Sequence, residues 1–500
     1  MQQQLAISFL HGRRALVLAL AAALGGCAAG PDYQRPAAPA VPGYTATPLP
    51  QHTAAAQGLL GEAQHWQMGA AVPLQWWRAL GAPRLDAWIA QALEASPTLA
   101  SAQAALRQAQ ELQAAQAAST RYPQVDAGLG AQRQRQNGSA LAPAGGAAPL
   151  ADVYSASLGV RYRFDLAGGD QQARLAWAAR TDYRRHQLHA ARLALAANLT
   201  GAALARARQA DQWAAMQALL QAQDEQLALA HQRLRLGSAG QDELLALQAQ
   251  AERTRSDLAL LRKQVQHSEH LLAVLAGQAP GTAAVPDFSL AEFRLPVELP
   301  VRVPSELVRH RPDILAAEAL LQAATADYGV AAARLYPQIQ LSASLGSQAL
   351  TTGALFGGGS AVWGMLAQLT QPLFNPALPA EKRAALAALD AAAASYQAVV
   401  LDALREVADA LGALEHDAQA QAALAASDAA AQAVLQSMER QYALGAAGYV
   451  QLLLARQQAQ QSRLGLIGAQ AQRLADSAAL YQAMGGGDAP PEMVVSRADP

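Results

Sequence analysis

The chain is poor in cysteine, in aromatic residues and in charge. Its 500 residues include a single cysteine, which excludes an intrachain disulfide framework. Lysine plus arginine (37) nearly balance aspartate plus glutamate (38), so there is no basic excess, and no nucleic-acid partner is expected. Aromatic residues make up only 5% of the chain, and much of the 52% hydrophobic content is alanine, which favours helices that approach one another closely.

A targeting segment occupies the first 26 residues. Arg13 and Arg14 precede an apolar run, residues 15–24, that is too short to span a bilayer as a stable helix. The run leads into Leu24-Gly25-Gly26-Cys27, which resembles the lipobox of bacterial lipoproteins. This resemblance implies that the leader is removed and that Cys27 carries a covalent lipid; no other cofactor is expected. An ordinary secretory leader with an incidental cysteine is the alternative.

The residue after the cysteine and the rest of the chain bear on location. Ala28 follows Cys27, and by analogy with lipoproteins the absence of aspartate there favours the outer membrane. No later segment has the long charge-free apolar run of a membrane helix, so any spanning part is expected to be β.

Two segments recur in the same order at nearly the same distance. Tyr122-Pro123-Gln124-Val125 is echoed by Tyr336-Pro337-Gln338-Ile339, and Leu236-Gly237-Ser238 by Leu444-Gly445-Ala446. The offsets are 214 (337 − 123) and 208 (445 − 237). The chain therefore contains a tandem-duplicated unit, in which strands are followed by a long helix, a glycine-marked turn and a second helix.

Four segments alternate apolar and polar residues with period two. The clearest places six apolar side chains on one face and polar or small ones on the other: Tyr154, Ala156, Leu158, Val160, Tyr162 and Phe164 against Ser155, Ser157, Gly159, Arg161, Arg163 and Asp165. Segments beginning at Val125, Ile339 and Trp363 behave alike, with Leu366 as an exception. Strands of about ten residues, apolar outside and polar inside, are typical of a transmembrane barrel. A soluble sandwich with one wet face is the alternative.

Four strands cannot close a barrel by themselves, and an open sheet edge in lipid is prohibitive. If the strands span a membrane, the chain must therefore assemble with further copies. Three copies would supply twelve strands.

The helices are expected to be long and to pack as coiled coils. The first, near residues 171–236, would measure about 100 Å at 1.5 Å per residue. The returning helix carries two heptad seams: Leu244, Ala251, Leu258, Val265 and Leu272, with Leu247, Thr254, Leu261, Ser268 and Leu275. In the second copy, Leu452, Ala459, Leu466 and Leu480 repeat the pattern, but Arg473 interrupts it. The turn glycines Gly237, Gly240, Gly445 and Gly448 suit helix ends that need a positive φ.

These patterns divide the chain into six parts. They are a signal peptide (1–26), a lipidated tether that is either mobile or packed on the surface (27–75), a first repeat (76–276), an inter-repeat linker (277–304), a second repeat (305–487) and a tail (488–500). Strands are expected near 122–166 and 337–374, and helical hairpins near 171–276 and 380–484. Pro376 and Pro379 stand where the second strand pair becomes helix, and their effect on that junction is open.

Several longer motifs resemble one family. Pro304-Ser305-Glu306-Leu307-Val308-Arg309-His310-Arg311-Pro312-Asp313-Ile314, then Ala317-Glu318 and Tyr336-Pro337, resemble the signature of the TolC/OprM-like outer-membrane factors, the NodT lipoproteins. So do Cys27-Ala28-Ala29-Gly30-Pro31-Asp32-Tyr33-Gln34-Arg35-Pro36 and Leu480-Tyr481-Gln482-Ala483-Met484-Gly485-Gly486-Gly487. His310 replaces the usual arginine before Arg311.

The resemblance implies a fold and partners. The fold would be an α+β membrane protein with four strands per protomer, a homotrimer with a twelve-stranded barrel in outer-membrane lipid. A long periplasmic α-helical barrel and an equatorial belt, built from the linker and the chain ends, would complete it. The expected partners are a periplasmic adaptor protein and an inner-membrane RND-type pump.

Members of this family gate and dock at the periplasmic helix tips. Carried over by position, the tip residues of this chain are Arg233, Arg235, Gly237, Gly240, Asp242, Glu243, Arg440, Tyr442, Gly445 and Gly448. An acidic ring from Asp242 and Glu243 could favour cations. Relatives often carry aspartate in the second tip, whereas this chain has Gln451 and Leu454. The alternative is that both acids simply favour a helix N-terminus.

Signs of catalysis or metal binding are weak. His186 and His189, like His267 and His270, have i,i+3 spacing on expected helices, but neither pair has a convincing third ligand nearby. Arg311-Pro312-Asp313 suits a helix start, with capping and turn-fixing roles. The chain is therefore not expected to be an enzyme.

The pattern as a whole favours a passive export duct, the outer-membrane component of a tripartite efflux pump for drugs or other small toxic compounds. A duct for type I protein secretion and a structural coiled-coil lipoprotein are the alternatives. A spacer would have no use for amphipathic strand pairs.

Overall fold

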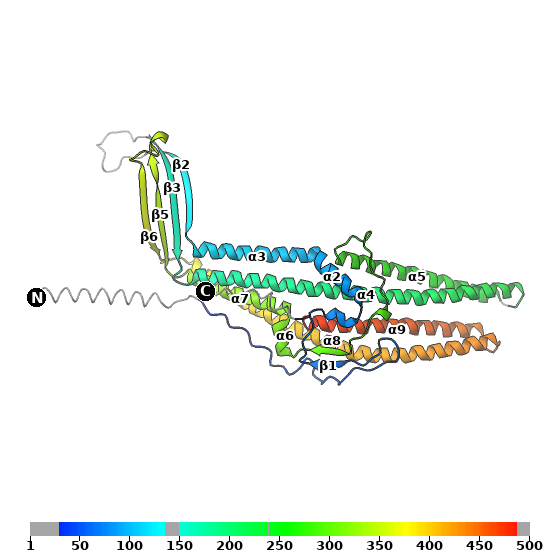
Figure 1. The fold of residues 1–500 in the computed structure, drawn as a ribbon. Helices are drawn as coiled ribbons and strands as arrows, with labels where there is room; N and C mark the ends of the chain where they lie inside the picture. Colours follow the sequence, from blue (N-terminus) through cyan, green and yellow to red (C-terminus); the bar gives the residue numbers. More distant parts are fainter. Residues whose placement is uncertain (1–29, 136–149, 239, 488–500) are drawn as a thin grey trace. The chain divides into compact units, whose positions relative to one another are not determined.

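The computed structural model describes residues 30–135, 150–238 and 240–487, within which the chain forms two compact units (Figure 1). The first unit comprises residues 30–35, 105–135, 150–184 and 317–396. The second comprises residues 36–104, 185–238, 240–316 and 397–487. The predictions for the leader, for Cys27 and for the tail lie outside the described residues.

The first unit contains a four-stranded antiparallel sheet (Figure 1). Its strands, in order across the sheet, are β2 (Gln124–Arg135), β3 (Leu150–Phe164), β5 (Gln338–Ala349) and β6 (Ala361–Thr370). A 3-10 turn, η3 (Thr352–Ala354), lies between β5 and β6. The four predicted strands are thus confirmed. The strand pair of the first repeat is joined to that of the second by the pairing of β3 with β5.

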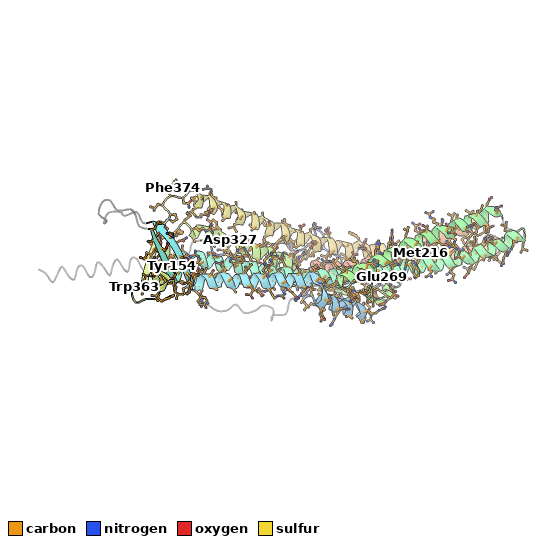
Figure 2. All side chains as sticks on the ribbon, turned by 90° about the horizontal axis from the view of Figure 1, so that it is seen from above. Tyr154, Met216, Glu269, Asp327, Trp363 and Phe374 are labelled. Atoms are coloured by element: carbon orange, nitrogen blue, oxygen red, sulfur yellow. The ribbon has the colours of Figure 1, made fainter. Side chains whose placement is uncertain are left out.

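The strand register collects the apolar residues of all four strands on one face. Leu158 pairs with Ala127 and with Leu345, and Leu345 pairs in turn with Trp363. Trp363 is 80% exposed, so the described part of the protomer leaves this face uncovered, as contact with lipid requires. Figure 2 labels Trp363 beside this sheet, together with Tyr154 of β3.

The opposite face of the sheet carries the polar residues. Arg161 of β3 donates a hydrogen bond to Asp126 of β2 at 2.5 Å, between neighbouring strands. Leu366 pairs with Ser342 on this face, so it remains the apolar exception. The predicted alternation is therefore confirmed.

The helices of the two repeats match in length. The long helices α4 (Gly169–Arg235) and α8 (Ala377–Ala443) each have 67 residues, and the returning helices α5 (Gln241–Leu275) and α9 (Tyr449–Ala483) each have 35. At 1.5 Å per residue the long helices measure about 100 Å, as predicted. The shorter helices α3 (Pro97–Arg121) and α7 (Pro312–Ala333) complete the repeats. These equal lengths support the duplication.

Helix α8 differs from the expectation that no later segment resembles a membrane helix. Among the described residues, α8 is long and apolar enough to cross a membrane by length and composition, and most of its apolar stretch is exposed in the protomer. Its alanine content produces this property, because alanine is apolar but small.

The second unit holds the elements from the tether and the linker. β1 (His65–Met68) pairs in parallel with β4 (Glu298–Val301), and the unit also contains η1 (Trp76–Leu80), α2 (Pro83–Ala95), η2 (Leu290–Glu292) and α6 (Pro304–His310). The ring of Trp76 stacks on Tyr481 of α9 at 5.7 Å. Residues 65–68 of the tether are therefore packed on this unit and not mobile, which is one of the two alternatives expected for the tether.

The helix ends repeat one turn geometry four times. Gly237 has a φ of +70°, its N–H bonds to the carbonyl of Leu234, and the N–H of Ser238 bonds to the carbonyl of Arg233. This pair of bonds is a Schellman motif, which needs a left-handed residue. Gly277, Gly445 and Gly485 have the same positive φ and the same two bonds. The separations 445 − 237 and 485 − 277 are both 208, so the duplication extends to backbone conformation.

The strand-to-helix junction of the second repeat accommodates both prolines. α8 begins at Ala377, so Pro379 lies in the first helical turn, where a missing N–H costs no helical bond. Asn375 accepts a hydrogen bond from the Ala377 N–H at 3.0 Å, and it stabilises the turn from Pro376 into the helix.

Candidate gate and docking site

The two helix–helix turns of the second unit carry the predicted site residues. Gly237 and Gly445 occupy left-handed positions, as predicted. For Gly240 and Gly448 the same expectation was wrong: both have a φ of −81° and precede α5 and α9 with extended backbone. Any residue can adopt that conformation, so residue type alone could not distinguish a helix stop from a helix start.

Three predicted tip residues from three different helices form one network. Arg233 near the end of α4 donates a hydrogen bond from Nη1 to the Tyr442 hydroxyl at 2.8 Å. That hydroxyl, near the end of α8, donates in turn to Oε1 of Glu243 in the first turn of α5 at 2.9 Å. Arg233 and Glu243 also lie 3.9 Å apart as an ion pair. The network therefore links the helical hairpin of the first repeat to that of the second.

The electrostatics favour this arrangement. Burial raises the pKa of the Tyr442 phenol, and the bond to Glu243 raises it further, so the hydroxyl keeps the proton that it donates. The Arg233 guanidinium lies 5.9 Å from the centre of the Tyr442 ring, within range of a cation–π interaction.

An apolar cluster supports the network from below. Ala230 of α4 and Leu244 and Leu247 of α5 are buried together, and Tyr449 of α9 packs against them. The rings of Tyr442 and Tyr449 meet edge to face at 6.2 Å, and burial raises the pKa of Tyr449 to about 12. The network thus lies beside a buried apolar cluster, while its own polar groups are half-exposed at the end of the hairpins.

The other predicted tip residues do not enter the network. Arg235 and Asp242 are exposed, and Arg440 is exposed with its Nε bonded to the carbonyl of Gln436 at 3.2 Å. Asp242 and Glu243 therefore differ in environment, although they are adjacent: one faces water and the other is held by Tyr442. This separates their possible roles.

In the second tip, Gln451 stands where relatives often carry aspartate, and its side chain has a capping role. The Gln451 side chain accepts a hydrogen bond from the N–H of Gly448 at 2.9 Å and caps α9. Leu454 is 60% exposed. A capping role for Gln451 leaves the acidic groups of this site on the first tip.

Arg473, the residue that interrupts the heptad seam of α9, is the centre of a buried hydrogen-bond network. Arg473 of α9 is fully buried, and its guanidinium donates hydrogen bonds to oxygens of the tether and of α8. The acceptors are the Leu60 and Glu62 carbonyls, Thr53 Oγ1, Gln64 Oε1 and Gln421 Oε1, at 3.0–3.3 Å. A cation on an apolar seam was the available signal, but four of its five acceptors lie more than 400 residues away in the tether and could not be predicted from the sequence.

Asp476, about one turn along α9 from Arg473, forms a carboxyl pair with Asp417 of α8. Burial and a hydrogen bond shared with Asp417 of α8 raise the pKa of Asp476 to about 7, while Gln472 donates to Asp476 Oδ1 at 2.8 Å. Asp476 therefore keeps its proton to a higher pH than an exposed aspartate does.

The first unit has a polar hollow where strands become helices. A cavity of about 340 Å³ is lined by residues of β3, α4 and α7, including Arg163 from the polar face of the sheet. Arg163 is paired with Asp170, and Arg180 donates to Asp327 at 2.5 Å. Arg163 from the polar face of the sheet and Phe164 from the apolar face both line this hollow, so it lies at the end of the sheet where β3 leads into α4.

The motif Arg311-Pro312-Asp313 has a structural role. The buried guanidinium of Arg311 bonds to Asp313 at 2.6 Å, to Glu406 of α8 at 2.7 Å and to the Ala483 carbonyl at 2.9 Å. Asp313 Oδ1 also accepts from the Ile314 N–H at 2.9 Å in the first turn of α7. The motif thus fixes the corner between α6 and α7 and joins it to the middle of α8 and to the C-terminal end of α9.

The histidines form no cluster in the described part of the chain. The rings of His186 and His189 lie 6.4 Å apart, and burial followed by the charge of His186 lowers the pKa of His189 to about 4. Within residues 30–135, 150–238 and 240–487, no three histidine, cysteine or acidic side chains are placed to hold a metal ion.

A sheet with one lipid-compatible face and two open edges, attached to two long helical hairpins, defines a membrane channel protein that several copies complete. The profile of one family, described as outer membrane efflux protein, matches residues 88–278 and 303–486. The chain belongs to this family, which confirms the resemblance seen in its motifs.

Two curated relatives and one solved structure illustrate the likeness. The chain is 31% identical to the outer membrane protein OprJ of Pseudomonas aeruginosa over 486 residues, covering 95% of this chain and 96% of OprJ. It is 32% identical to the pyoverdine export outer membrane protein OpmQ of Pseudomonas putida over 422 residues, covering 83% and 88%. The structure of the outer-membrane channel OprN superposes with a TM-score of 0.82 at 26% identity, covering 92% and 99%.

These likenesses establish the architecture and the location. The fold is that of the trimeric outer-membrane efflux channels, in which four strands per protomer complete a twelve-stranded barrel above a long helical domain. The protein is an outer-membrane efflux channel that extends into the periplasm.

Proposed function

We propose that this protein is the passive duct of a tripartite efflux pump for drugs or other small toxic compounds. A periplasmic adaptor would dock at the helix tips, and an inner-membrane RND-type pump would supply the energy. The chain itself shows no nucleotide-binding or proton-relay motif. Its family consists of outer-membrane channels, which supports the role of a conduit.

The observation that carries this proposal is the network of Arg233, Tyr442 and Glu243. It ties two hairpins together at their free ends with a few half-exposed hydrogen bonds, each worth about 1 kcal/mol net. Bonds of that strength would stabilise a closed channel, and bonds between the tips and an adaptor could replace them. A gate requires a closed state that is stable but can be opened by a binding partner.

Small-molecule cargo is supported by the relatives' names, among them a pyoverdine exporter. The drug-efflux reading rests on the resemblance to the lipoprotein branch of the family. Type I protein secretion remains the second candidate. A purely structural lipoprotein is disfavoured by the exposed apolar face of the sheet.

Covalent lipid on Cys27 is part of this proposal. It is supported by the Leu-Gly-Gly-Cys motif directly after the apolar run. Mass spectrometry of the mature N-terminal peptide tests it. An unmodified Cys27, or a mature chain that begins elsewhere, would overturn it.

The experiment that tests the duct is photo-crosslinking in cells from Ser238 and Ala446, both exposed in the tip turns. A matched probe at Glu381, exposed in the first unit, controls for random capture. We expect an adaptor of a proton-driven drug pump from the tips and not from the control. Capture of a secretion-type adaptor would change the cargo to proteins. Capture of no adaptor at normal abundance would contradict the docking site.

A further inference from the structure

The beginning of the described chain lies along α7 as a strap. We define the strap as residues 30–35, which form neither helix nor strand and belong to the first unit. A Cβ atom on Gly30 would lie 2.7 Å from the Gly329 Cα, so the two backbones are in direct contact. Only glycine permits this approach, because Gly30 also has a φ of +136°.

The other end of the strap is held by one carboxylate. The Tyr33 hydroxyl donates to Glu318 Oε1 at 3.1 Å, and Arg35 Nη2 donates to Glu318 Oε2 at 2.7 Å. Tyr33 and Arg35 stand two residues apart, so in an extended chain both side chains point to the same side. The Glu318 side chain is only 13% exposed, and both of its oxygens are used by the strap.

The dimensions of the strap and of the helix agree. Glu318 and Gly329 lie 11 residues apart (329 − 318), which is three helical turns, so they share one face of α7 and are separated by about 17 Å. Five extended residues from Gly30 to Arg35 span about the same length. The strap therefore runs antiparallel to α7, with its N-terminal end toward the strands that follow this helix.

The strap also avoids the polar hollow of the first unit. Asp327 and Val330 of α7 line the hollow, whereas Gly329 contacts the strap. Around the helix axis, Gly329 is about 100° from Val330 and about 160° from Asp327. The strap thus occupies a face of α7 that is separate from the face lining the hollow. Two motifs by which the family was recognised, Tyr33-Gln34-Arg35 and Ala317-Glu318, are hence the two halves of one contact.

We propose that Glu318 is the receptor of this strap and holds the lipid-bearing end of the chain against α7, near the start of β5. The part concerning lipid rests on the proposed modification of Cys27; the contact itself does not. Two residues lie between Cys27 and Gly30 in the sequence, so the chain length alone limits the distance between the Cα atoms of these residues to about 11 Å. Glu318 acts as a positioning residue that keeps the anchor at the end of the helix where the sheet begins.

Chymotrypsin cleavage of purified trimers tests the receptor. Cleavage after Tyr33 requires the strap to lift from α7, so its rate reports the fraction of lifted strap. Glu318→Gln keeps the size of the side chain but removes its charge, and we expect it to accelerate this cleavage at least about tenfold. Arg35→Gln, which leaves the Tyr33 bond in place, should accelerate it less. Equal rates in Glu318→Gln and wild type would overturn the proposal.

Two controls keep the outcome specific. Tyr44, whose hydroxyl donates to the Arg302 carbonyl at 2.6 Å in the second unit, should be cleaved at the same rate in all variants. Glu381→Gln removes an exposed ion pair with Arg334 elsewhere in the first unit and should leave Tyr33 protected. Accelerated cleavage at Tyr44 as well would indicate general loosening and contradict a specific receptor.

The mass of the released fragment tests the lipid on Cys27 independently of the role of Glu318. This mass shows whether residue 27 carries acyl chains. A fragment without lipid, with Tyr33 still protected in the wild type, would overturn the lipid anchor and leave Glu318 as the receptor of the strap. A lipidated fragment released equally fast from all variants would preserve the anchor and overturn the role of Glu318.

Discussion

The hydroxyl of Tyr442, the penultimate residue of α8, donates a hydrogen bond to Glu243 in the first turn of α5 at 2.9 Å. The two residues are 199 positions apart in the chain and belong to different repeats. This bond, together with the one from Arg233, is the described polar link between the two hairpins at their tips. The gate hypothesis therefore depends on a single phenol.

Tyr442→Phe is expected to favour the open channel. The substitution removes the hydroxyl and keeps the ring beside Arg233 and Tyr449, so it should weaken the closed state by about 1 kcal/mol. Bilayer recordings of purified trimers should show a higher open probability or conductance. Tyr449→Phe is the matched control, since that ring packs on the apolar cluster. If both variants resemble the wild type, the network does not gate the channel.

The adjacent acids are expected to have different effects when neutralised. Glu243→Gln weakens the bond to Tyr442 and should raise conductance, whereas Asp242→Asn removes an exposed charge and should lower cation selectivity. Reversal potentials in a salt gradient distinguish the two. Unchanged selectivity and conductance in both variants would leave these acids with the simpler role of favouring the N-terminus of α5.

Sequence patterns predicted the local features of this protein well because each is encoded over a few residues. The alternation around Leu158 defined a strand face, and Gly237 and Gly445 marked helix ends that need a positive φ. The same reasoning failed for Gly240 and Gly448, because a glycine at a helix start looks no different in sequence.

Contacts between distant segments could not be predicted from one sequence. Arg473 was visible only as an interruption of a seam, and Glu318 only as part of a motif. Their partners in the tether lie hundreds of residues away, and no periodicity connects them. Tyr442 and Glu243 were both named as tip residues, but only the fold shows that they touch while Asp242 does not.

The apolar sheet face is expected to tolerate no charge. Leu345 of β5 pairs with Leu158 and Trp363 on that face, so Leu345→Arg should destabilise the assembled barrel by about 2–4 kcal/mol. Ser344→Arg, one residue away on the polar face, should be tolerated. The yield of heat-modifiable trimer on gels measures both. Equal loss in the two variants would argue against a lipid-facing surface at Leu345.

Arg473 is expected to be essential for seating the tether. Arg473→Met fills the space but removes the donor of Gln64 Oε1, Gln421 Oε1 and the Glu62 carbonyl, so we expect a loss of at least about 3 kcal/mol in the free energy of unfolding. Arg463→Met, on the same helix with a half-exposed side chain paired to Asp428, should cost less than about 1 kcal/mol. Thermal dissociation of the trimer compares the two, and a similar shift in both would refute the special role of Arg473.

Asp476 is expected to make stability depend on pH. Burial and the hydrogen bond shared with Asp417 raise its folded pKa to about 7, above the unfolded value of 3.8. Between these values the folded state binds more protons than the unfolded state, so stability is greatest at the acidic end and falls as pH rises toward 7. Asp476→Asn keeps the shape and removes the titration, so its melting temperature should fall less than that of the wild type between pH 5 and pH 8. Asp428→Asn on α8 serves as the control, since its carboxylate pairs with a half-exposed arginine. Parallel pH profiles for the wild type and Asp476→Asn would show that the carboxyl pair does not titrate in this range.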